Sequence, residues 1–375
     1  MRSLKINVSI IILLFINFIF SYKYSLRYTE FAIYLSIILL IFQLFIFQFS
    51  NKICLTNKLK NIICYALFSF LVGLVFISHI AVPIEFLNVD RWSVISSFLT
   101  ELYNGNYPYF AKSHSGNYPG PMPIYYLIAS PFHLMGELSI LSCLGYCILT
   151  ALLIKKVNVN ENIKFLLFYM FTSVYLIWEI TTRSNLFTFT ILTLLVLDEV
   201  INLNNKNTLK FHVLAVLTGL VLSTRSIYIL PYMIFFISSL TNKEITFKKL
   251  FLFLSIALVA FVSTFIPFIY FFYDDFFTMN PFIIQSSFLI PKLYPLIFIL
   301  ISILLAFLVK NKIDKFFYSG LSLFIAILIY AFYHLFNSGY EVSFINSKID
   351  ISYFIFCIPF LIKYLMGNSK QEKKQ

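Results

Sequence analysis

Charged residues, glycine and proline are all scarce in this chain, and their scarcity excludes most soluble folds. Asp, Glu, Lys and Arg make up 12% of the 375 residues, hydrophobic residues make up 60%, and the mean hydropathy is +0.87. Soluble globular domains carry about 25% charged residues, roughly twice this share. We therefore expect a membrane protein.

Motifs that bind soluble nucleotides or metals are missing as well. The sequence has no Walker loop, no dinucleotide fingerprint and no HExxH, which disfavours ATP-driven transport and soluble-nucleotide chemistry. Its five cysteines form no CxxC and no disulfide framework. Cys143 and Cys147 lie one helical turn apart, where we expect packing rather than metal binding. No internal repeat suggests the inverted halves of a secondary transporter.

Long apolar runs dominate the chain, and many approach the roughly 20 residues that a helix needs to cross a bilayer. Because lipid offers no partners for backbone polar groups, such runs must be helical. The sequence predicts an all-α, polytopic membrane protein in which residues 1–375 form a single integral membrane domain. Twelve spanning helices are expected near residues 6–21, 31–49, 62–82, 138–154, 163–178, 186–201, 209–224, 227–240, 250–273, 293–309, 316–336 and 351–366.

The segment 121–136 is also apolar, but Pro123 and Pro131 interrupt it. The positive-inside rule places the linker with Lys155 and Lys156 in the cytoplasm, and this holds only if 121–136 does not cross. We therefore expect an interfacial or re-entrant helix there. With this topology, both termini and most of the 28 Lys and Arg residues are cytoplasmic. The net charge of +12 then reflects topology and gives no evidence for a nucleic-acid partner.

Residues 86–136 form the longest segment that cannot be a spanning helix, and we expect an ordered extracytoplasmic loop that forms part of the site. Trp92–Tyr103 has apolar residues at helical spacing, as an interfacial helix does. Gly105–Pro123 concentrates glycine and proline, which fix a compact loop. Tyr109 and Tyr118 offer flat faces and hydroxyls suited to a sugar, although tyrosines are also typical of membrane-interface belts.

Ionisable side chains gather on the predicted outer side, at helix ends and in short turns. A charge at bilayer depth costs about 2.5–3.5 kcal/mol, so such residues usually face a cavity, form pairs or take part in chemistry. These candidates are Asp90, Arg91, Glu101, His114, Glu179, Arg183, Arg225, Asp274, Asp275, His334, Glu341 and Asp350. The outer end is therefore where we predict the site.

Several of these residues have both a structural and a functional interpretation. Asp90 can cap a helix or pair with Arg91, or it can serve as a general base or ligand for an acceptor hydroxyl. Arg225 lies between two apolar helices and suits phosphate oxygens, with an internal salt bridge or snorkelling as alternatives. Glu179 and Arg183, spaced i, i+4, can pair with each other or belong to the site.

Asp90, followed by LYNGNYPYF (Leu102–Phe110) and NYPGPMPIYYLIASPFHLMG (Asn117–Gly136), resembles the first outer loop of the GT-C glycosyltransferases. These polytopic membrane enzymes, mannosyltransferases among them, take a sugar from a polyprenyl-phosphate donor. The similarity continues more loosely through Trp178–Asn185 and Gly219–Tyr232.

The resemblance implies transfer of a hexose or pentose to a glycan, lipid or protein acceptor outside the cytoplasm. Asp90 is the implied base and Arg225 the ligand of the departing lipid phosphate. The further substrate-binding candidates are Arg91, Tyr109, His114, Tyr118, Glu179 and Arg183. The Ile-, Phe-, Lys- and Asn-rich composition indicates a bacterial cytoplasmic membrane.

Two other functions stay open, a polysaccharide polymerase or ligase and a non-enzymatic transporter of lipid-linked sugars. No metal ligand is predicted and no cofactor is certain. No second acidic residue directly adjoins Asp90, so the sequence does not decide whether the site uses a metal. A divalent cation therefore stays an alternative.

Overall fold

The computed structural model describes residues 2–50, 52–156, 159–203, 208–288, 291, 293–346 and 349–367. Every regular element among these residues is a helix, so the all-α prediction is confirmed. The bundle helices are α1 (Arg2–Ser25), α2 (Ala32–Ser50), α3 (Asn57–Ala81), α6 (Ser139–Ile154), α7 (Glu161–Phe171), α8 (Val174–Thr181), α9 (Leu186–Ile201), α10 (Thr208–Leu222), α11 (Ile229–Thr241), α12 (Phe247–Ser263), α16 (Leu293–Phe307), α17 (Asp314–Tyr340), η5 (Ile351–Cys357) and α18 (Ile358–Gly367).

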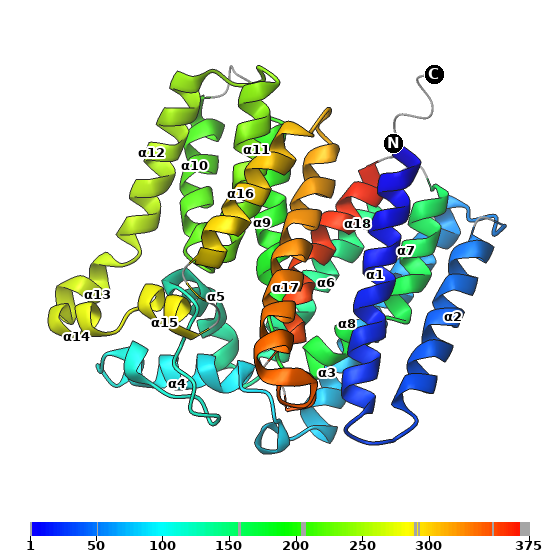
Figure 1. Ribbon diagram of the computed structural model, residues 1–375, viewed down its shortest axis with the longest axis horizontal. Coiled ribbons are helices and arrows are strands. Elements are labelled where there is room, and N and C mark those ends of the chain that lie inside the picture. Colours follow the sequence, from blue (N-terminus) through cyan, green and yellow to red (C-terminus); the bar gives the residue numbers. More distant parts are fainter. Residues whose placement is uncertain are drawn as a thin grey trace.

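Shorter helices cover one end of this bundle, which we call the loop end (Figure 1). They are α4 (Arg91–Tyr103), α5 (Pro123–Leu134), α13 (Ile266–Phe271), α14 (Tyr273–Thr278) and α15 (Pro281–Phe288). Figure 1 shows α1 beginning and α18 ending together at the opposite end. Met1 and residues 368–375, for which the sequence predicts a cytoplasmic location, lie outside the described residues.

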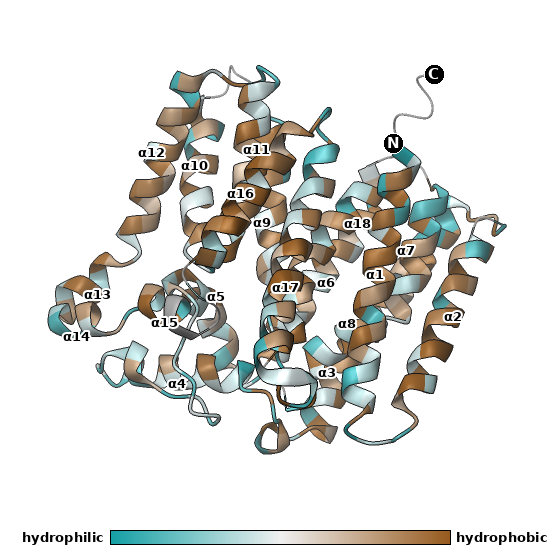
Figure 2. Ribbon diagram, viewed as in Figure 1, coloured by the Kyte–Doolittle hydropathy of each residue, from teal (hydrophilic) through white to brown (hydrophobic). Residues whose placement is uncertain are grey.

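The outer surface of the bundle is apolar, as expected for helices that face lipid and not water. The buried residues of α2 are Ala32, Ser36, Gln43 and Ser50, whereas its large apolar side chains, such as Ile38 at 63%, are exposed. Figure 2 shows that α2, α12 and α16 consist largely of hydrophobic residues. Small and polar residues inside, with large apolar ones outside, are typical of helices that pack in a membrane.

Among the described residues, five helices are long and apolar enough to cross a membrane: α1, α2, α3, α12 continued by α13, and α17 continued to Ile345. There are seven if each of two bent pairs is one span, namely α7 with α8, bent by 46°, and α5 with α6, bent by 111°. Helices also lie at the other predicted positions, but α9, α10, α11, α16 and α18 are shorter. The chain is an integral membrane protein, and its twelve-span topology stays a prediction.

The break between α7 and α8 is satisfied by polar residues of the first two helices. Gln43 Nε2 donates to the carbonyl and to the hydroxyl of Thr172, both at 3.1 Å. Asn17 Oδ1 accepts from Val174 N at 2.9 Å. Asn17 and Gln43 are almost fully buried. Because lipid provides no hydrogen bonds, these two side chains make the bend possible.

Glycine allows two pairs of helices to pack closely. A Cβ at Gly219 of α10 would lie 2.1 Å from the carbonyl oxygen of Ala257 in α12. A Cβ at Gly145 of α6 would lie 2.7 Å from the Cα of Thr188 in α9. Both glycines are therefore required by close backbone approach, the usual basis of tight helix pairs in membranes.

Segment 86–136 forms the loop end together with α13–α15. The helix predicted over Trp92–Tyr103 is present as α4, which buries Ile95 and Phe98, the latter against Tyr126 of α5 and Phe268 of α13. The Pro- and Gly-rich part is fixed by contacts to distant elements. The backbone N–H of Met122 donates to the carbonyl of Thr224, and that of Ile124 donates to the carbonyl of Ser223, both at 3.1 Å. The loop thus lies against the end of α10.

Candidate active site

Asp90 directly precedes α4 and is half-buried. Its Oδ2 accepts hydrogen bonds from Ser113 Oγ at 2.8 Å and from Asn117 Nδ2 at 2.7 Å. The side chain makes no cap bond to α4, and within the described chain the carboxylate that pairs with Arg91 is another one. Asp90 is therefore oriented by two neutral donors of the loop, and neither structural interpretation describes it.

Arg91 connects the start of α4 to η5. Its guanidinium forms an ion pair with Asp350 and donates to Ser352 Oγ at 3.1 Å. The guanidinium carbon lies 5.1 Å from the centre of the Tyr353 ring. Burial alone lowers the pKa of Arg91, but the neighbouring Tyr353 hydroxyl and Asp90 carboxylate outweigh this effect and raise it. Arg91 is therefore a permanent cation beside Asp90.

Arg225 follows α10 at the loop end and has aromatic rather than acidic neighbours. Its guanidinium carbon lies 5.1 Å from the ring centre of Tyr125 and 5.8 Å from that of Phe356. Its Nε is buried, and within the described part of the chain no hydrogen bond or ion pair joins the Arg225 side chain to another residue. Since arginine keeps its charge in proteins, this site holds an uncompensated cation.

Two parallel rings of η5 bring the arginines together. Tyr353 and Phe356 stack with centres 5.8 Å apart and an interplanar angle of 9°. Arg91 lies over the first ring and Arg225 over the second, and Tyr125 interacts with both cations. We call these five residues the arginine cluster. It adjoins Asp90, so the structure brings together three of the residues that the sequence singled out.

Arg183 belongs to a different network. Its Nε donates to Glu137 Oε1 at 3.2 Å, and its two terminal nitrogens donate to the carbonyls of Thr181 at 2.7 Å and Ser78 at 3.0 Å. Glu137 Oε2 also bonds His79 Nδ1 at 2.8 Å. Each nitrogen of the Arg183 guanidinium thus has a partner within the protein, which favours a structural role over phosphate binding.

Glu179 is fully buried in α8 and does not pair with Arg183. It accepts from Tyr146 Oη at 2.6 Å and from Phe187 N at 2.8 Å, the latter in the first turn of α9. The i, i+4 pairing fails because α8 ends at Thr181 and Arg183 adopts a left-handed φ of +56°. Glu179 therefore caps α9.

The loop tyrosines differ in exposure. Tyr109 is fully buried, packs edge-on against Phe98 and donates to Pro121 O at 3.4 Å. Burial raises the pKa of its hydroxyl. Tyr118 is half-exposed, and the Lys112 amine lies 5.2 Å from the centre of its ring. Tyr109 thus serves the loop core, whereas Tyr118 can reach a ligand.

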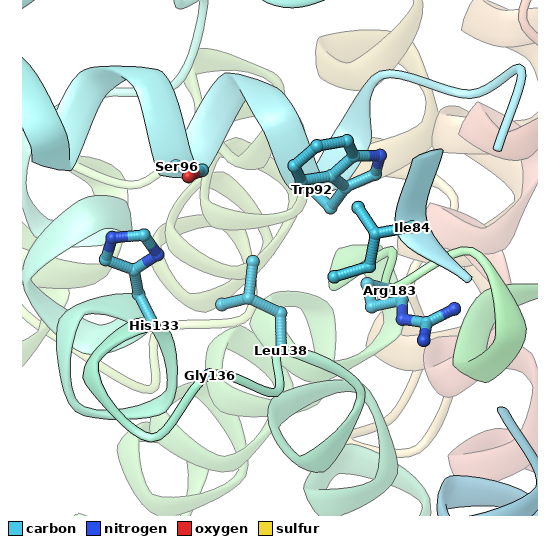
Figure 3. Close-up of a pocket in the computed structure, with 7 residues that line it drawn as sticks. All are labelled: Ile84, Trp92, Ser96, His133, Gly136, Leu138 and Arg183. Atoms are coloured by element: carbon cyan, nitrogen blue, oxygen red, sulfur yellow. The ribbon is translucent and has the colours of Figure 1, made fainter. Parts of the chain in front are cut away.

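His114 is exposed and lies beside Asp90's helix. Its Nδ1 is 2.8 Å from Ser93 Oγ, and its ring stacks on Trp92 at 5.7 Å. Trp92 in turn lines a pocket of about 150 Å³ between α4 and the turn from α5 to α6 (Figure 3). Arg183 also lines this pocket, and no member of the arginine cluster does.

Sequence patterns did not single out Tyr125, Tyr353, Phe356 or Glu137. The three rings look like ordinary apolar helix residues until long-range contacts place them under the arginines. Glu137, an acid directly before an apolar helix, carries the same signal that marks Asp90. Within the described ranges, no group of three or more His, Cys, Asp and Glu side chains could hold a metal ion.

No family model, curated protein or solved structure matches this chain.

Proposed function

We propose that this protein is a membrane glycosyltransferase of GT-C type. It transfers a sugar from a polyprenyl-phosphate-linked donor to a hydroxyl group of a glycan, lipid or protein acceptor, on the extracytoplasmic face of a bacterial cytoplasmic membrane. The support is a carboxylate held by neutral donors beside Arg91, and a second arginine of the same cluster, Arg225, that has no acidic partner among the described residues.

The proposed reaction assigns one step to each of two residues. Asp90 accepts the proton of the acceptor hydroxyl while that oxygen attacks C1 of the sugar. The bond between C1 and the phosphate oxygen breaks, and the lipid phosphate leaves with the bonding electrons. Its negative charge rises in the transition state, so Arg225 binds the transition state more strongly than the donor. Guanidinium–phosphate contacts are among the stronger charge-assisted hydrogen bonds.

The observation that carries the proposal is the lack of a partner for Arg225. An internal salt bridge is not found among the described residues, and the half-buried side chain keeps its Nε out of solvent. Even a partly buried charge without a counter-ion is costly. An anionic ligand removes that cost, and a lipid phosphate reaches this depth together with its own membrane anchor.

The test is transfer by the full chain purified into lipid nanodiscs. Polyprenyl-phosphate hexoses and pentoses serve as donors, envelope extract supplies acceptors, and release of polyprenyl phosphate is measured. Asp90→Asn should lower the rate by about 10²–10⁴. Arg225→Gln should lower kcat/KM for the donor by about 10- to 100-fold, since hydrogen bonds to charged groups contribute roughly 1.5–3 kcal/mol.

Two variants serve as matched controls on the predicted outer side. Glu101→Gln changes an acid of the same helix that bonds only Asn106 in the described structure. Arg27→Gln changes an exposed arginine after α1. Both should keep wild-type rates. An Asp90→Asn protein at full rate removes the proposed base, and a wild-type protein that consumes none of these donors ends the proposal.

A further inference from the structure

No residue of the arginine cluster lines the pocket in Figure 3, which lies along α4, the helix that Asp90 directly precedes. Trp92 and Ser96, one turn apart on α4, form one wall, and His133 and Leu138 form the other. The connection to Asp90 is short. His114 stacks on Trp92 and bonds Ser93, whose hydroxyl donates to the carbonyl of Asp90 at 3.1 Å.

The charge of this pocket is already cancelled. Arg183 is the one lining residue with a permanent charge, and Glu137 and two carbonyls use each of its side-chain nitrogens. A phosphate or carboxylate would have to break a buried ion pair to bind there, which is strongly unfavourable. The pocket therefore suits a neutral ligand.

The uncharged polar groups of this pocket are the side chains of Ser96 and His133. They offer hydrogen-bond donors and acceptors beside the apolar surfaces of Trp92 and Leu138. An alkyl chain would satisfy none of these groups, whereas a hydroxylated ring has both an apolar face and hydrogen-bonding edges.

We infer that this pocket binds a neutral sugar ring of the acceptor, with Trp92 as its apolar platform. The assignment of that ring to the acceptor rests on the proposed function, because Asp90 would then take its proton from a sugar hydroxyl at the first turn of α4. The acceptor is accordingly a glycan or a glycosylated carrier.

Binding can be measured without any transferase assay. The chain has two tryptophans, so Trp178→Phe leaves Trp92 as the only indole. Glucose, mannose, galactose and N-acetylglucosamine are titrated against this variant in nanodiscs, with betaine at equal osmolality as the blank. At least one sugar should change the Trp92 emission saturably. Inorganic phosphate should neither cause nor compete with that change.

Two leucine substitutions in the Trp178→Phe background localise the signal. Ser96→Leu fills the pocket and should weaken sugar binding at least tenfold. Ser97→Leu places the same side chain on the next residue of α4, which does not line the pocket, and should leave binding unchanged. Size-exclusion profiles confirm that all variants fold.

Several outcomes overturn the inference. They are no saturable change with any of the four sugars, equal weakening by both leucine variants, and a change caused by phosphate itself. A different result would separate the two proposals: the protein binds a sugar, Ser96→Leu abolishes that binding, and no lipid-linked donor is consumed. The sugar site would then stand, and the proposed glycosyltransferase function would be refuted. The two failures are therefore distinguishable.

Discussion

The ion pair between Glu137 and Arg183 gives the sharpest test of the structure. The side chain of Arg183 is 1% exposed and that of Glu137 is 9% exposed. The two other contacts of the guanidinium are to neutral carbonyls. Glu137→Gln keeps the size of the side chain but removes the only carboxylate within ion-pair distance of Arg183 among the described residues.

We expect Glu137→Gln to lower the free energy of unfolding by about 3–5 kcal/mol, the usual cost of leaving one charge of a buried pair uncompensated. Arg183→Met should cost less, because Glu137 keeps its bonds to His79 Nδ1 and to Ser139 N. The double variant should cost less than the sum of the two single ones, since the uncompensated charge is then absent.

The assay is unfolding of the purified protein in mixed micelles by increasing denaturing detergent, followed by tryptophan emission. Glu101→Gln is the control, and it should stay within about 0.5 kcal/mol of the wild type, as surface substitutions do. If Glu137→Gln behaves like this control, or if the effects of the double variant simply add, the buried ion pair does not exist as the structure has it.

Three further predictions follow from the same contacts. Burial raises the pKa of Glu137, but hydrogen bonds from Ser139 and His79 and the charge of Arg183 outweigh this effect and lower the pKa below 4.5. The ionised carboxylate therefore stabilises the fold above about pH 4.5, and this stabilisation is lost as the pH falls further. In acid, the unfolding curves of the wild type and of Glu137→Gln should converge. Asp350→Asn leaves Arg91 without its counter-ion and should cost about 1.5–3 kcal/mol in the same detergent titration. Gly219→Leu should separate α10 from α12 and lower the expression of folded protein. The next residue, Leu220, is half-buried, so a leucine side chain is accommodated there but not at position 219.

The sequence was sufficient for fold class because the signals are local. Apolar runs of helical length predicted α1, α2, α3 and α17, and spacing predicted α4 to within one residue. The bend of 111° between α5 and α6 fits either a broken span or a re-entrant segment, so the prediction that 121–136 does not cross the membrane stays a prediction.

The site was predictable only in part because its contacts are not local. Arg91 and Asp350 are 259 residues apart, and no local pattern links them. The i, i+4 spacing of Glu179 and Arg183 assumed a continuous helix, but the chain leaves helical geometry after Thr181. Tyr109 shows the same limit, since its place in the loop core depends on packing against α4.

The polar side chains at the break between α7 and α8 have a consequence for biogenesis. Asn17 and Gln43 belong to the first two helices, which leave the ribosome well before Thr172 is made. Without these hydrogen bonds, the backbone groups at the break between α7 and α8 have no partners in lipid. We therefore expect α7 and α8 to adopt their bent form after α1 and α2 have inserted. The order of synthesis is then also the order of assembly. Loss of the Asn17 or the Gln43 side chain should therefore increase degradation of the newly made protein.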